Sequence, residues 1–256
     1  MDTLIEVRNL MKIYNPGENE VRALNDVSLQ IARGEFVAII GQSGSGKSTF
    51  MNMLGCLDVP TSGSYYLNGK DVAGLSDDEL SEIRNQEIGF IFQGFNLIQN
   101  LTALENVELP LIYRNVPAAK RHEMSTASLE KVGLSNRMDH KPTEMSGGQQ
   151  QRVAIARALA AAPPVILADE PTGNLDSASS REIMQILRGL HEEGRTVILI
   201  THDNNIAASA RRVIRIMDGK IVSDTDLSGD QGKSIEEIAA KIEAEGHLCD
   251  KNQKAV

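Results

Sequence analysis

The 256-residue chain has little of several residue types that mark specialised classes of protein. It contains no tryptophan, aromatic residues make up 4%, and there are two cysteines, Cys56 and Cys249. The cysteines stand in unrelated contexts, without a CxxC pair or a Cys/His cluster, so the sequence shows no zinc-site spacing. We interpret both as free thiols in a reducing compartment.

Long apolar runs and an excess of basic residues are also absent. The longest apolar run, at 158–168, is broken by Pro163 and Pro164 and is too short for a transmembrane helix. The start, MDTLIEVRNL, lacks the apolar region of a signal peptide. A net charge of −9 disfavours a broad nucleic-acid surface. The sequence therefore predicts a soluble, cytoplasmic chain with no nucleic-acid partner.

Short apolar, β-branched runs predict the strands of a buried parallel sheet. They lie at 36–40, 88–92, 165–168 and 196–200. A helix is expected between the last two runs, because apolar residues recur there with helical spacing at Ile183, Ile186, Leu187 and Leu190. Such a strand–helix–strand unit is the building block of an α/β fold.

The flanking regions have different patterns. The first third, which includes Val21–Ile31 and SGSYYLNG, predicts an antiparallel layer of short strands with glycine-rich turns. The middle, about 76–160, is predicted to be mostly helical, with capping-box spacing at Ser76/Glu79 and Thr102/Glu105.

The chain after about residue 229 is predicted to be a linker followed by a short amphipathic helix and a disordered tail from Cys249. Ser234/Glu237 has capping-box spacing at the start of this helix. One face of the helix carries Ile235, Ile238, Ala239 and Ile242. We expect the helix to be packed on the domain, with a regulatory or partner-docking role as the alternative.

The segment GQSGSGKS, residues 41–48, directly follows the first buried strand and precedes a helical pattern. This is the context that a phosphate-binding loop requires: its glycines let backbone N–H groups surround phosphate oxygens at a helix N-terminus. Lys47 is expected to reach the β- and γ-phosphates, and the Ser48 hydroxyl to bind Mg²⁺.

Polar residues follow the other strands. The strand VILAD ends at Asp169, which is expected to hold Mg²⁺. Glu170 follows it directly and is expected to act on an attacking water. Gln93 follows the second strand as a candidate ligand of metal or water, and His202 follows the fourth as a candidate γ-phosphate donor. Parallel strands end at one edge, so these side chains should converge there.

In this order and spacing the motifs resemble those of the ATP-binding cassette (ABC) ATPases. The resemblance covers about residues 4–222: GQSGSGKST resembles Walker A, Gln93 the Q-loop, MSGGQ the signature, VILADE Walker B, GNLD the D-loop and His202 the switch histidine. Met145 stands where the family usually has leucine. The resemblance implies an α/β P-loop NTPase with a RecA-like core, an antiparallel β subdomain and an α-helical subdomain at about 95–162, within a nucleotide-binding domain of 1–228.

The family resemblance also assigns site residues. ATP and Mg²⁺ are the implied ligands, with catalytic roles for Glu170, His202 and Gln93 and metal ligands at Ser48, Gln93 and Asp169. The implied nucleotide contacts are Tyr14, Val21, Gly41, Ser43, Gly44, Ser45, Gly46, Lys47, Ser48, Thr49, Gln93, Ser146, Gly147, Gly148, Gln149 and Asp176. Tyr14 is the expected platform for the adenine, with an exposed turn tyrosine as the alternative.

The signature residues pose a geometric question, because Ser146–Gln149 form a second anion-binding turn although a phosphate loop already exists. In the family the signature faces the Walker A of a second subunit, so the resemblance implies a head-to-tail homodimer that encloses two ATP molecules. Finer features, such as KIY-x₆-VRAL and ADEPTGNLD, resemble the lipoprotein-releasing and macrolide-exporting (LolD/MacB) group, which includes antimicrobial-peptide resistance ATPases.

That resemblance implies a transport ATPase on the inner face of the cell membrane, paired with a separate permease that has an extracytoplasmic domain. Residues 94–114 are expected to contact this permease, through Phe95, Leu97, Ile98 and Leu101; internal packing of these side chains is the alternative. A cell-division or other regulatory ABC ATPase without an export role is the alternative function.

Overall fold

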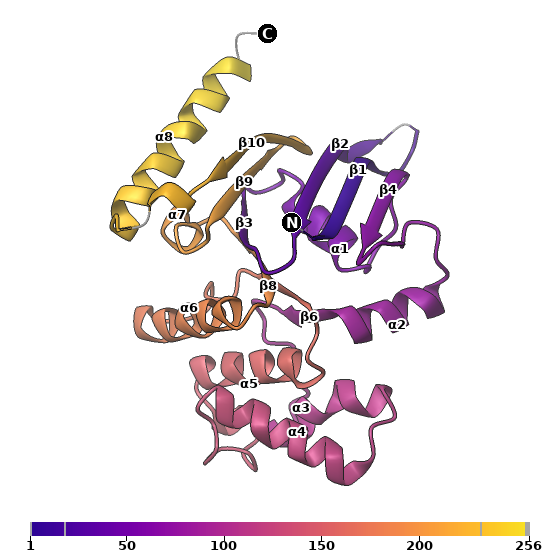
Figure 1. Cartoon of the computed structure of the whole chain (residues 1–256), viewed down its shortest axis with the longest axis vertical. Coiled ribbons are helices and arrows are strands. Elements are labelled where there is room, and N and C mark those ends of the chain that lie inside the picture. Colours follow the sequence, from indigo (N-terminus) through magenta and orange to yellow (C-terminus); the bar gives the residue numbers. More distant parts are fainter. Residues whose placement is uncertain (1, 18, 231, 254–256) are drawn as a thin grey trace.

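The computed structural model describes residues 2–17, 19–230 and 232–253, and side chains up to residue 246 except at positions 18 and 231. Ten strands and eight α-helices follow one another along these residues (Figure 1). The strands are β1 (Thr3–Tyr14), β2 (Val21–Ala32), β3 (Phe36–Ile40), β4 (Ser62–Leu67), β5 (Lys70–Asp71), β6 (Ile88–Ile91), β7 (Val165–Asp169), β8 (Thr196–Thr201), β9 (Arg212–Met217) and β10 (Lys220–Asp226). The helices are α1 (Lys47–Leu54), α2 (Asp77–Glu87), α3 (Ala103–Tyr113), α4 (Ala118–Lys131), α5 (Gly147–Ala160), α6 (Ser177–Glu192), α7 (Asn204–Ala207) and α8 (Ile235–Gln253).

The strands form two sheets. Six of them form a mixed sheet in the order β10-β9-β3-β8-β7-β6, in which all neighbours are parallel except the β9–β10 pair. The other four form an antiparallel sheet in the order β2-β1-β4-β5. All four predicted buried strands are confirmed, and so is the antiparallel layer predicted for the first third.

Alternate residues of the mixed sheet belong to two different hydrophobic cores. In β3, Ala38 and Ile40 pack in a core built with helices α3–α8, whereas Val37 and Ile39 pack in a core shared with α1 and the antiparallel sheet. Since successive side chains of a strand point to opposite faces, both faces of the sheet are covered. This explains why these strands are continuously apolar in sequence.

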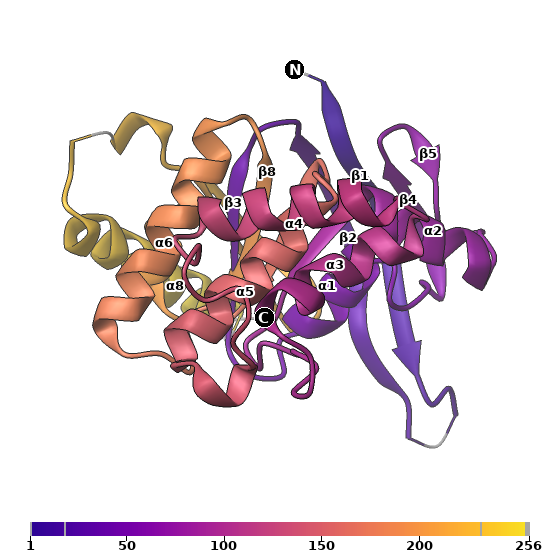
Figure 2. The same ribbon diagram turned by 90° about the horizontal axis from the view of Figure 1, so that it is seen from below.

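Helices α3, α4 and α5 gather on one side of the mixed sheet, as Figure 2 shows from below. Ser76 and Thr102 cap α2 and α3 with the predicted capping boxes. The predicted helix between β7 and β8 is α6, with Ile183, Leu187 and Leu190 buried. The boundaries of the helical subdomain at 95 and 162 and of the domain at 228 stay predictions.

The C-terminal helix α8 is longer than predicted. It extends to Gln253, so its backbone is helical at 249–253, where the sequence analysis expected disorder; residues 254–256 and the Cys249 side chain lie outside the described part. Ala239 and Ile242 are buried in the core as predicted, whereas Ile235 is exposed. No helix in the described residues is long and apolar enough to cross a membrane.

Candidate functional site

The loop between β3 and α1 is held close to two other strands by its glycines. Gly46 has a φ of 104°, and a Cβ at this position would lie 2.4 Å from the Ala23 carbonyl oxygen. A Cβ on Gly41 would lie 2.3 Å from the carbonyl oxygen of Ile216. Any side chain at either position would therefore push the loop away from β2 or β9. The loop leads directly into helix α1, whose positive N-terminal end faces the cleft described below.

Lys47, the first residue of α1, is bound by its own loop. Its Nζ donates hydrogen bonds to the carbonyl oxygens of Gly41 at 2.7 Å and Gln42 at 2.9 Å. Partial burial lowers the pKa of Lys47, whereas the nearby Glu170 and Asp169 raise it. The ammonium group is therefore held in the loop by neutral carbonyl oxygens. A charged acceptor such as a phosphate oxygen could replace them as its hydrogen-bond partner.

Asp169 and Glu170 stand at the carboxyl end of β7. Burial and the neighbouring Glu170 raise the pKa of Asp169, while Lys47 opposes this shift. Glu170 has a φ of 44°, in the left-handed region, and its N–H donates to the Ile200 carbonyl of the neighbouring strand β8. An acidic residue held in this backbone conformation is typical of a functional site, because the strain needs support from its surroundings.

That support comes in part from Thr201, the last residue of β8, and from His202, which follows the strand. His202 Nδ1 lies 2.7 Å from Glu170 Oε1, and Thr201 Oγ1 lies 3.3 Å from Glu170 Oε2. The His202 side chain is 71% exposed, whereas the Glu170 side chain is 17% exposed. The structure thus pairs two residues that the sequence analysis placed at the same edge but did not predict to touch.

Gln93 follows β6 and is linked to the loop after Glu170 through Asn174. The Asn174 amide donates to the Gln93 backbone carbonyl at 3.1 Å, and the Gln93 amide lies 3.4 Å from Asn174 Oδ1. Sequence reasoning assigned no role to Asn174. Its position within GNLD, one residue after Gly173, is the only sequence signal that could have drawn attention to it.

Lys47, Gln93, Asp169, Glu170 and His202 line one cleft of about 1120 Å³. The predicted residues that line it are Tyr14, Val21, Gly41, Ser43, Gly44, Gly46, Lys47, Ser48, Thr49, Gln93, Asp169, Glu170 and His202. The cleft is also lined by Arg22, Arg215 and Asp218, which the sequence analysis missed. They lie on β2, on β9 and in the turn between β9 and β10, where no motif marks them.

Tyr14 lies at the end of β1 and is half-buried, so it is not the freely exposed turn residue of the alternative interpretation. Its hydroxyl donates to Asp58 Oδ2 at 2.8 Å, and Lys12 Nζ lies 4.9 Å from the centre of its ring. The aromatic ring is therefore held at the wall of the cleft, where a base could stack on it.

The other predicted contacts do not line the cleft. Ser45 is buried, with its N–H donating to Gln42 and its carbonyl accepting from Gly219. Asp176 caps helix α6 by accepting from the N–H groups of Ala178 and Ser179. The signature residues Ser146, Gly147, Gly148 and Gln149 also lie away from the cleft, at the start of α5.

The signature is an exposed helix N-terminus. Ser146 and Gln149 form a reciprocal capping box: Ser146 Oγ accepts from the Gln149 N–H at 3.3 Å, and Gln149 Oε1 accepts from the Ser146 N–H at 2.9 Å. A Cβ on Gly148 would lie 2.6 Å from Ser179 Oγ, so this glycine lets α5 approach α6 closely. The turn is thus pre-formed next to the D-loop, and among the described residues it does not line the cleft that holds the phosphate loop.

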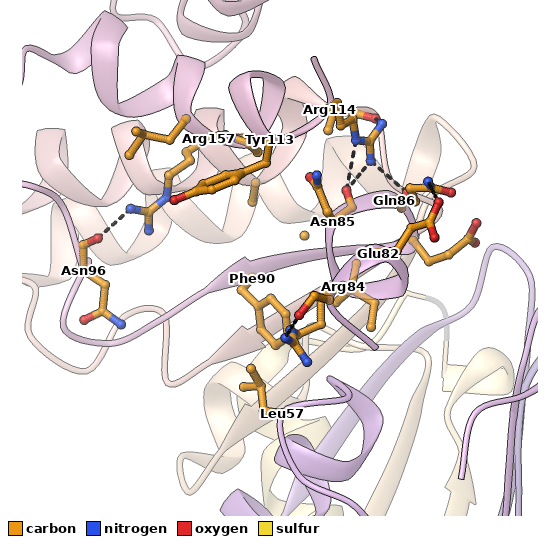
Figure 3. Close-up of a pocket in the computed structure, with 18 of the residues that line it drawn as sticks. Leu57, Glu82, Arg84, Asn85, Gln86, Phe90, Asn96, Tyr113, Arg114 and Arg157 are labelled. Atoms are coloured by element: carbon orange, nitrogen blue, oxygen red, sulfur yellow. Dashed lines mark hydrogen bonds between the residues drawn. The ribbon is translucent and has the colours of Figure 1, made fainter. Parts of the chain in front are cut away.

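A second cavity, about 1240 Å³, lies between α2 and β6 on one side and α3 and α5 on the other (Figure 3). Arg84, Arg114 and Arg157 line it, and all three guanidinium groups donate to backbone carbonyls. Leu57 and Tyr113, 46% and 78% exposed, add apolar surface. We call this cavity the arginine groove.

Comparisons with known proteins agree with these motifs. A family model described as ABC transporter matches residues 24–173. Macrolide export ATP-binding/permease proteins MacB from Aggregatibacter actinomycetemcomitans and Hyphomonas neptunium are 56% and 54% identical over 87% and 91% of this chain. The chain spans 34% and 36% of their lengths. A dimeric ATP-binding cassette solved in a post-hydrolysis state with ADP and Pi is 49% identical, with a TM-score of 0.81, over 88% of this chain and 99% of that one.

The close approach of Gly46 to Ala23 predicts the effect of one added methyl group. We expect Gly46→Ala to weaken ATP binding at least about tenfold, because the clash displaces the loop and a left-handed alanine costs about 1–2 kcal/mol. Gly69→Ala is the matched control, since Gly69 also has a positive φ, 78°, but an added Cβ would contact nothing. Titration of both variants with a fluorescent ATP analogue measures the difference. Equal affinities would contradict the account of the loop.

Proposed function

The chain belongs to the ABC transporter family as an ATPase cassette of the LolD/MacB type, and from this premise we propose that two copies hydrolyse ATP between them to drive a membrane permease. One observation carries the proposal. Lys47, Gln93, Glu170 and His202 come from the ends of four strands to a single cleft, while the pre-formed signature turn lies outside it. One chain therefore holds a nearly complete hydrolytic site and, elsewhere, a capped helix N-terminus of the kind that binds anions.

Glu170 is the proposed general base. Its carboxylate would accept a proton from water as the water oxygen attacks the γ-phosphorus and ADP leaves. His202 now contacts Glu170 Oε1, and it is exposed enough to turn towards a γ-phosphate in the same cleft. His202 would thus orient the base, and it would contact the γ-phosphate of a bound ATP.

The oxygen donors at the same edge fit a magnesium ion. The Ser48 hydroxyl, the Asp169 carboxylate and the Gln93 amide line the cleft, and these are the hard ligands that Mg²⁺ prefers. When bound, the ion would neutralise charge on the β- and γ-phosphates. Within the described residues no three His, Cys, Asp or Glu side chains form a metal-binding cluster, so phosphate oxygens and water would have to complete the coordination.

The signature is proposed to act in a second copy of the chain. Ser146 and the following glycines would place the positive end of α5 against a γ-phosphate bound by the partner's loop. The related cassette solved with ADP and Pi is described as dimeric, which supports this arrangement. Asp176 caps α6, the helix that packs against the signature at Gly148. We propose that Asp176 lies at the same interface.

The arginine groove is the proposed contact with the permease. The 94–114 segment lines part of it, through Asn96 and Tyr113 among others. Ile98 belongs to the same segment without lining the groove and is 45% exposed, while Leu97 is 8% exposed. Of the predicted contact residues, Ile98 is therefore free to meet a partner, whereas Leu97 packs inside. Whether the permease is a separate chain stays a prediction, because the MacB relatives join both parts in one protein.

This assignment also sets the place and purpose of the ATPase. A cassette bound to a permease would sit at the inner face of the cell membrane. Export is the favoured process, because the relatives with 52–56% identity are named macrolide export proteins. The permease, with an extracytoplasmic domain of its own, would determine which substrate is moved.

The dimer is tested by the mass of a Glu170→Gln variant with and without ATP. Without the base, ATP should bind and stay uncleaved, and light scattering should show a shift from 27.9 kDa to about twice that mass. Adding Ser146→Arg should abolish the shift, because it blocks the signature. The control Ser62→Arg, the same change at an exposed site on β4, should leave the shift intact. If the mass still doubled with ATP after Ser146→Arg was added, the result would contradict the proposed interface.

The permease contact is tested by cysteine cross-linking at two neighbouring positions. With the permease present and carrying a cysteine in a cytoplasmic loop, Ile98→Cys should form a disulfide with it under mild oxidation. Leu97→Cys is the control and should react at least about tenfold less, because its side chain is buried. Equal reaction at both positions, or reaction at neither, would place the contact elsewhere.

A further inference from the structure

The turn after Gln93 is strained. Phe95 and Asn96 have φ angles of 61° and 50°, and within the described ranges they are the only two consecutive non-glycine residues with positive φ. Asparagine tolerates this region, but the bulky side chain of phenylalanine disfavours it, so Phe95 needs support from its surroundings. The strained turn begins two residues after Gln93, which lines the nucleotide cleft.

Arg157 of α5 holds this turn. Its guanidinium donates to the carbonyl oxygen of Asn96 at 2.5 Å (Figure 3). It also donates to the carbonyl oxygen of Phe95 at 2.9 Å. Burial lowers the pKa of Arg157. Among the described residues this half-buried guanidinium forms no ion pair, and its two hydrogen bonds go to the carbonyls of the strained turn. Arg157 uses its two terminal nitrogens for this, Nη1 for Asn96 and Nη2 for Phe95, so the planar guanidinium fixes both carbonyls in one geometry.

Gln151, also on α5, holds the other side of Gln93. Its side chain is fully buried, and its amide donates to the carbonyl oxygens of Phe92 at 3.3 Å and Pro171 at 2.8 Å. Both neighbours are acceptors, so the amide nitrogen must face them. Pro171 follows Glu170 directly, and Gln151 therefore links the Gln93 loop to the loop that carries the general base.

We propose that Gln151 and Arg157 are positioning residues of the ATPase, which fix Gln93 by holding the backbone on both sides of it to helix α5. The two side chains are six residues apart, or about 9 Å along the helix, and they bracket residues 92–96. This inference rests on the proposed function. Because α5 also begins with the signature, Gln93 in one site is placed by the same rigid helix whose N-terminus meets the nucleotide of the other site.

A purely structural role would have a different signature in measurements. If Arg157 only stabilised the fold, its loss would lower the melting temperature and the fraction of active protein, and the effect would add to that of any other variant. If it acts through Gln93, its loss should lower turnover while ATP still binds, and should have little further effect once the Gln93 side chain is gone.

The test is a double-mutant cycle on the full chain, measuring steady-state ATPase activity and ATP affinity. Arg157→Lys keeps the charge but replaces two fixed donor nitrogens with a single ammonium on a shorter side chain, which would hold the two carbonyls less rigidly; we expect kcat to fall about tenfold with KM within about twofold of the wild type. In a Gln93→Ala background the same change should cost less than about twofold. Arg121→Lys is the control. Arg121 bonds to Glu108 and to the Val116 carbonyl, so this substitution should leave kcat unchanged.

Gln151→Met supplies a second variant in case Arg157→Lys does not fold, which thermal melting would show. It should also lower kcat without raising KM and should also lose its effect in the Gln93→Ala background. Additive losses, or an unchanged kcat in the folded variants, would overturn the inference. ATP hydrolysis that was unchanged in the Glu170→Gln variant would instead overturn the proposed function.

Discussion

The carboxyl edge of the parallel sheet is the constraint on which the site depends. Strands β3, β6, β7 and β8 pair in parallel, so the residues that follow them must emerge at one edge although they are up to 160 positions apart in sequence. The phosphate loop, Gln93, the Asp169–Glu170 pair and His202 are these residues. The two cores fix the strands from both faces, and the register of the strands sets the spacing of the chemical groups.

In the chain as it stands, the protein's own groups satisfy the main charged side chains of this edge. Lys47 donates to two carbonyls of its loop, and Glu170 is held by His202 and Thr201. The carbonyl partners of Lys47 are neutral, whereas a phosphate oxygen carries charge, so a bond to phosphate would add the Coulombic attraction of opposite charges to the hydrogen bond. A triphosphate should therefore displace the carbonyls from Lys47, and release of the phosphate should restore these contacts.

Much of this arrangement could be predicted from the sequence. The four buried strands, the phosphate loop and the convergence of Asp169, Glu170, Gln93 and His202 follow from apolar runs and the order of polar residues. Contacts made by backbone geometry could not be predicted, such as Asn174 on the Gln93 carbonyl or Arg157 on the strained turn, because periodicity does not reveal which carbonyl a side chain meets. The length of α8 was also missed, since the composition of 249–253 resembles that of a disordered end.

The central claim is that each site is completed by a second copy, and mixing two defective chains tests it most directly. In a Glu170→Gln background, Ser146→Arg removes one chain's signature and Lys47→Ala the other's phosphate loop. Each variant alone should retain no ATP. Mixed, they share one intact site between the first chain's loop and the second chain's signature, so we predict about one retained ATP per mixed pair, against two for the parent dimer. A mixture that retains no more ATP than either variant alone would contradict completion by a second copy.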